Sequence, residues 1–136
     1  MLSPSLTTIR LFTHVFAASI WVGGQVVLGA LVPRFRQVSP DATKTAARAF
    51  ATVAWPAYAV VIVTGFWNLA EIDVADTSAS YQITIFVKII LAVATGAAAA
   101  VHSAASSKVV MAVGGAVGLL GAVGAMFVGY LLTTGS

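Results

Sequence analysis

Hydrophobic residues fall into four long runs along the chain, over residues 9–32, 49–70, 82–102 and 109–132. A helix rises about 1.5 Å per residue, so each run is long enough to cross a hydrocarbon core of about 30 Å. A membrane β-barrel would instead show segments of roughly ten residues in which apolar and polar positions alternate. The pattern therefore predicts an all-α integral membrane protein with four transmembrane helices.

The connections between these runs are short, and the longest are residues 33–48 and 71–81. Neither has room for a soluble domain, so we expect a single transmembrane domain over residues 1–136. Short connections place consecutive helices side by side and antiparallel. The predicted architecture is an up-and-down four-helix bundle.

Charged residues near the ends of the runs predict the orientation in the membrane. Residues 71–81 contain acids and no base, whereas residues 33–48 contain one acid, Asp41, and four bases: Arg34, Arg36, Lys44 and Arg48. Basic loops are retained on the cytoplasmic side. We therefore expect residues 33–48 to form a cytoplasmic loop and residues 71–81 an outer loop, with the N-terminus and the C-terminus both outside.

Composition agrees with a membrane protein, because the chain is 60% hydrophobic and 8% charged, with a mean hydropathy of +1.00. The net charge of +3 and the pI of about 9.7 come from bases that adjoin the runs. The positive-inside rule explains these bases, so the expected partner is the lipid bilayer and not a nucleic acid. The chain has no cysteine, which excludes disulfides and thiolate metal ligands.

The first run contains a histidine and other polar or aromatic residues at helical spacing. Residues seven apart differ in direction by about 20°, so His14, Trp21 and Gln25 fall on one stripe. An ionisable side chain inside a transmembrane segment is a candidate functional residue, because burying it in lipid is costly. We expect the stripe to line an outward-opening pocket between the helices. The alternative for His14 is a hydrogen-bonded structural role.

Polar residues of the other runs fall at a similar depth. By their helical rise, Lys88 and Met126 lie level with His14, roughly 8 to 9 Å below the outer boundary, and Asn68 lies slightly above. His102 lies about 20 Å away, at the inner end. The alternatives are that Lys88 extends to the headgroups and that Met126 only fills the core. The predicted cofactor-binding residues are His14, Trp21, Gln25, Asn68 and Lys88, and the predicted metal ligands are His14 and Met126.

The last run is rich in glycine, and small residues let membrane helices approach closely. We expect this surface to pack inside the bundle. The alternative is that it forms a homodimer face or a contact with a larger membrane complex. The glycines concerned are Gly114, Gly115, Gly118, Gly121, Gly124 and Gly129.

Several motifs resemble the copper-resistance D (CopD-like) membrane family. They are His14-(six residues)-Trp21-Val-Gly23-Gly24, Pro33-Arg34, Thr64-Gly65, and Phe86-Val87-Lys88-Ile89-Ile90-Leu91. The resemblance covers the first three runs and implies copper binding or transport, in a bacterial plasma membrane. A more distant resemblance is to the HemJ-type protoporphyrinogen oxidases, haem-associated four-helix membrane proteins. It implies haem b, with His14 and Lys88 as the matching positions.

Three functions follow from these observations, and copper handling comes first. Copper transport needs soft or imidazole ligands in a graded path, and here His14 and Met126 would form one entry site. Haem b is the second, with His14 as the axial ligand and Lys88 as the partner of a propionate. The segment Arg36-Gln37-Val38 lacks the histidine of the HemJ pattern, which weighs against oxidase activity. The third is a small accessory subunit that packs in a larger complex.

Overall fold

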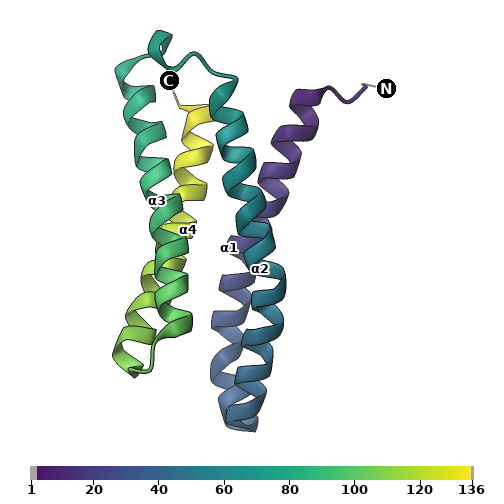
Figure 1. The fold of residues 1–136 in the computed structure, drawn as a ribbon, viewed down its shortest axis with the longest axis vertical. Coiled ribbons are helices and arrows are strands. Elements are labelled where there is room, and N and C mark those ends of the chain that lie inside the picture. The colour runs from purple at the N-terminus through teal and green to yellow at the C-terminus, as the bar shows by residue number, and fades with distance from the viewer. Residues whose placement is uncertain (1–2, 136) are drawn as a thin grey trace. The chain divides into compact units, whose positions relative to one another are not determined.

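The computed structural model describes residues 3–135, and within them every regular element is helical. The long helices are α1 (Leu6–Val38), α2 (Pro40–Ala70), α3 (Ala79–Ala104) and α4 (Lys108–Thr134), as Figure 1 shows. A short 3-10 turn, η1 (Val74–Asp76), lies between α2 and α3. The prediction of an all-α chain with four long helices is confirmed for the described residues.

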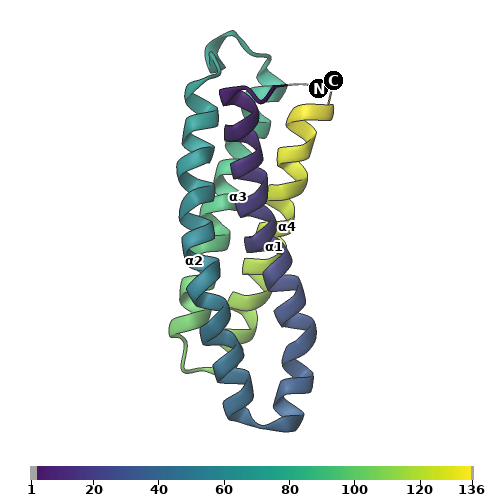
Figure 2. The same cartoon turned by 90° about the vertical axis from the view of Figure 1, so that its right-hand side faces the viewer.

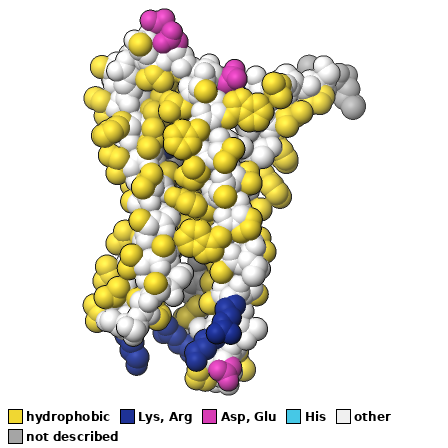
Figure 3. Space-filling model, viewed as in Figure 1, with side chains coloured by type: hydrophobic (Ala, Val, Ile, Leu, Met, Phe, Trp, Pro, Cys, Tyr) yellow, Lys and Arg dark blue, Asp and Glu magenta, His cyan; other side chains and the backbone are white. Residues whose placement is uncertain are grey.

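All four long helices are long and apolar enough to cross a membrane. Large apolar side chains such as Phe12, Phe66 and Leu120 are exposed on them. Figure 3 shows such side chains along the length of the helices, whereas charged side chains gather toward the helix ends. A surface of this kind is stable in contact with lipid and not with water. The structure thus indicates an integral membrane protein.

The chain divides into two compact units, Met1–Ile72 and Asp73–Ser136. The first contains α1 packed against α2, and the second contains α3 packed against α4. Figures 1 and 2 both show the helices of each pair side by side. Each pair has its own contacts and its own kind of packing.

Residues 33–48, the expected connection between the first two runs, are helical except at Ser39. Helix α1 continues through Pro33 to Val38, and α2 begins at Pro40. The Ser39 hydroxyl accepts a hydrogen bond from the Ala42 amide at 3.0 Å. Serine at the N-cap followed by proline at the first helical position is a strong helix start, so one extended residue is enough to end one helix and begin the next.

The glycines of α4 allow its backbone to pack closely against α3. A β-carbon on Gly114 would lie 3.2 Å from the Ala98 carbonyl oxygen, so the two backbones approach closely there. The hydroxyl of Thr95, which is 2% exposed, donates to the Gly118 carbonyl at 2.6 Å. The glycine surface is therefore used for packing inside the chain, as expected, and nothing in these contacts supports a homodimer.

Candidate functional site

His14 is held against α2 by a hydrogen bond. Its Nδ1 atom lies 2.8 Å from the Thr64 hydroxyl, in the part-buried contact between α1 and α2. Thr64 itself is 5% exposed. The residue after it is glycine, and a β-carbon on Gly65 would lie 3.4 Å from His14 Cε1. The ring thus rests on a surface without a side chain at that point.

The Thr64 hydroxyl also determines which ring nitrogen of His14 is protonated. The Thr64 hydroxyl donates to the Val60 carbonyl at 2.6 Å. A hydroxyl has a single hydrogen, so toward His14 its oxygen accepts a hydrogen bond from Nδ1–H. In the neutral imidazole the lone pair then lies on Nε2. An imidazole oriented through one nitrogen presents the other as a metal ligand.

An aromatic cluster lies farther along the same helix pair. The Trp21 ring is 4.5 Å from that of Tyr58 and 5.5 Å from that of Trp55, centroid to centroid. Trp21 is 5% exposed, whereas Gln25 uses its amide nitrogen to donate to the Trp21 carbonyl at 3.1 Å. Trp21 therefore forms a packed apolar wall, and the contact of Gln25 is with its own helix.

Arg10 occupies the opposite end of this pair, one turn before His14. It is 9% exposed, and its Nη1 atom lies 3.4 Å from Glu71 Oε1. Trp67 Nε1 donates to the same carboxylate oxygen at 3.3 Å, and the Trp67 ring centroid lies 6.0 Å from Arg10 Cζ. The sequence prediction did not include Arg10. The available signal was that it is the single Lys, Arg, Asp or Glu in residues 9–32.

Two buried polar atoms near this end have no hydrogen-bond partner among the described residues. They are Arg10 Nε and Asn68 Oδ1. Asn68 is on α2, one turn beyond Thr64, and was predicted as a site residue. Buried polar groups are nearly always paired with protein or water, so each exception indicates water, an ion or a ligand group.

The other predicted site residues, Lys88 and Met126, belong to α3 and α4. The Lys88 side chain runs along Gly129, where a β-carbon would lie 3.3 Å from Nζ. Met126 is 43% exposed on α4. These contacts are within the second unit, so the sharing of one pocket by His14, Lys88 and Met126 stays a prediction.

His102 has a structural contact at the last turn of α3. Its Nδ1 atom lies 2.6 Å from the Met111 carbonyl oxygen, and its ring packs on Gly115. The residue is exposed, unlike the part-buried His14. It therefore serves as a matched control for experiments on His14.

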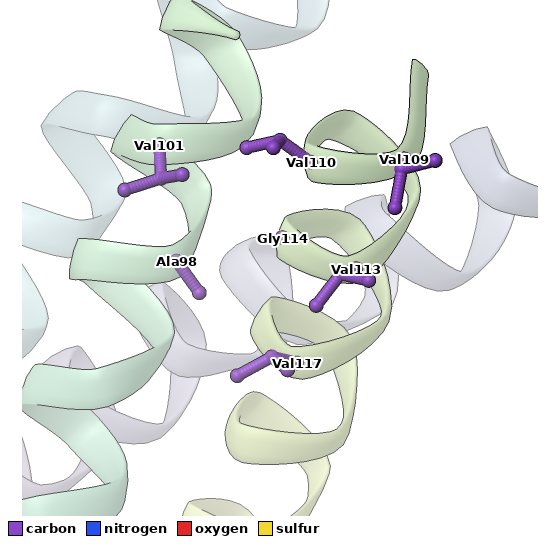
Figure 4. A pocket seen from close by; sticks show the side chains of 7 residues that line it. All are labelled: Ala98, Val101, Val109, Val110, Val113, Gly114 and Val117. Carbon is purple, nitrogen blue, oxygen red and sulfur yellow. The ribbon is translucent and has the colours of Figure 1, made fainter. Parts of the chain in front are cut away.

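The surface of α3–α4 has a shallow groove made almost wholly of valine. Figure 4 shows its lining residues, which are Ala98, Val101, Val109, Val110, Val113, Gly114 and Val117. None of these side chains can ligate a metal or donate a hydrogen bond. The groove is suited to a lipid chain and offers no chemistry.

Groups of three or more His, Cys, Asp or Glu side chains that would hold a metal ion are absent from the part of the chain that the structure describes. Comparison with known proteins finds no protein family, no curated protein and no solved structure that matches this chain. The CopD-like and HemJ-type resemblances therefore rest on the sequence motifs alone.

Proposed function

We propose that this membrane protein holds haem b through Nε2 of His14. The observation that carries the proposal is the hydrogen bond from His14 Nδ1 to Thr64, at 2.8 Å. Residues that ligate a metal through one imidazole nitrogen commonly donate from the other, which orients the ring and raises its basicity. A haem ligated in this way would supply one-electron redox chemistry.

The number of donors favours haem over a copper ion. Haem iron needs one axial side chain, because the porphyrin supplies its other ligands, whereas a copper site needs several soft or imidazole donors. Helices α1 and α2 contain one histidine, no cysteine and no methionine. His14 alone therefore meets the need of haem and falls short of a copper site.

The His14 ring packs directly on Gly65 of α2, where a β-carbon would lie 3.4 Å from Cε1, so the two helices hold the ring closely. The contact between Trp21 and Tyr58 lies about two turns farther along the same pair of helices. The role of Thr64 is to orient the imidazole, and an imidazole oriented through one nitrogen is a better ligand through the other.

Copper handling is the second candidate function. It is favoured by the CopD-like motifs and by the exposed thioether of Met126, which is a soft ligand. A copper site would need this residue, or another donor outside α1 and α2, to join His14.

An absorption spectrum with metal analysis tests the proposal. The full chain would be purified from its own membranes in mild detergent, as wild type, His14→Ala and His102→Ala. We expect a Soret band in the wild type and in His102→Ala, and its loss in His14→Ala. Bound copper without a Soret band, lost in His14→Ala, would favour the second candidate. Neither haem nor metal, even after addition of each, would leave the accessory-subunit hypothesis.

A further inference from the structure

Arg10 has more hydrogen-bonding capacity than its recorded partner uses. A guanidinium has five N–H donors, and Nε with Nη2 forms one edge with two parallel N–H groups, the edge that binds a carboxylate bidentately. The contact with Glu71 is through Nη1, on the other side of the group. Nε is buried and has no partner among residues 3–135. The Nε edge is thus suited to a second carboxylate.

The pairing of α1 with α2 places this edge close to the His14 site. Arg10 contacts Glu71 and His14 contacts Thr64, which fixes the antiparallel register. Arg10 and His14 are one turn apart, about 6 Å along the axis. Asn68 lies between Thr64 and Glu71 on α2, at a level between Arg10 and His14. Its buried Oδ1 atom, which has no partner among the described residues, is an acceptor and so calls for a donor, not for a carboxylate.

We propose that Arg10, through its Nε edge, binds a propionate carboxylate of the haem that His14 ligates. This role rests on the proposed function. Arg10 is 9% exposed, and a buried charge is costly unless its donors are paired, so a carboxylate on the Nε edge would complete the pairing. Arg10 takes the role that the sequence had suggested for Lys88, whose described contact is with Gly129.

The test compares haem b with its dimethyl ester, in which both propionates are neutral. The full-length protein in detergent, freed of haem, would be titrated with each compound, and the Soret band would give both dissociation constants. We expect Arg10→Gln to weaken haem b binding by about tenfold or more, the usual scale for a charge-assisted hydrogen bond, and to leave binding of the ester unchanged. Arg36→Gln, at the exposed end of the same helix, should change neither.

Glu71→Gln separates ligand binding from a structural role. If Arg10 acts only by pairing with Glu71 to join the helix ends, Arg10→Gln and Glu71→Gln will weaken haem b and its ester alike. The proposal expects Glu71→Gln to leave haem b binding unchanged or tighter, because a competing carboxylate is removed. Helicity by circular dichroism checks that each variant folds. If Arg10→Gln does not fold, Arg10→Lys replaces it in the test, because lysine keeps the positive charge and lacks the bidentate guanidinium edge.

The outcomes distinguish this role from the proposed function. Equal weakening of haem b and the ester in Arg10→Gln, or no weakening of either, overturns the role of Arg10 while His14 ligation stands. A wild-type protein that binds neither compound overturns haem binding itself, and the role of Arg10 falls with it.

Discussion

The two helix pairs are packed by opposite means. In α3–α4, glycines bring the backbones together, and the buried polar contact is Thr95 with the Gly118 carbonyl. In α1–α2, bulky and polar side chains fill the contact: the Trp21 cluster, the His14–Thr64 hydrogen bond and the Arg10–Glu71 ion pair. Close backbone packing leaves no space for a ligand, whereas packing through polar side chains supplies groups that can bind one. The chemistry of this protein is therefore expected in α1–α2.

The largest loss of stability is expected when a bulky residue replaces a glycine in the contact between α3 and α4. In Gly114→Leu the new side chain would meet backbone atoms, since even a β-carbon would lie 3.2 Å from the Ala98 carbonyl oxygen and from the His102 amide nitrogen. Backbone cannot move aside as a flexible side chain can, so we expect a loss of about 3 kcal/mol in stability. Reversible unfolding in mixed detergent and SDS measures it.

Gly129→Leu is the matched control on the same helix. There the nearest atoms are Cε and Nζ of Lys88, the far end of a flexible side chain. We expect a markedly smaller loss than in Gly114→Leu. Equal losses at the two positions would show that the closeness of the backbones does not determine the stability of α3–α4.

Loss of a threonine hydroxyl is expected to cost less stability. It also tests which helix pair binds the ligand. Thr64→Val leaves His14 Nδ1–H without its acceptor, at a cost of about 1 to 3 kcal/mol in stability. If His14 ligates haem, the affinity should also fall by about tenfold, because the ring loses its orienting contact. Soret titration and unfolding of the same samples measure both quantities.

Thr95→Val makes the same chemical change in the other pair. It removes the hydrogen bond to the Gly118 carbonyl and should destabilise the protein to a similar degree. Haem affinity should stay at the wild-type value. A fall in affinity as large as that of Thr64→Val would contradict the assignment of the site to α1–α2.

The sequence was sufficient to predict the helices but not the partners of their polar residues. Hydropathy alone predicts four long apolar helices, and the helical rise along the second run places Asn68 near the level of His14. The sequence could not show that Thr64 meets His14, because that depends on the rotation and register of two helices. Arg10 was missed for a similar reason: by depth it lies at the membrane boundary, and its burial and its contact with Glu71 depend on how the helices pack.

The single-residue turn at Ser39 shows a second limit of sequence patterns. Bases and polar residues over 33–48 are typical of a loop, yet helices continue through them because serine and proline together allow an immediate restart. Hydropathy reports where a helix leaves the lipid and not where it ends. The helices are therefore longer than the apolar runs that predicted them.

The smallest effect is expected at Gly23, next to the tightly packed Gly24. A β-carbon on Gly24 would collide with the Phe50 ring, whereas one on Gly23 would meet no described atom within 4 Å. Gly23→Ala should therefore stabilise the protein by about 0.5 kcal/mol, through the higher helix propensity of alanine. Gly24→Ala should destabilise it, because Phe50 must move. Unfolding in mixed detergent and SDS measures both, and a loss of stability in Gly23→Ala would mean that this open position is occupied in the membrane.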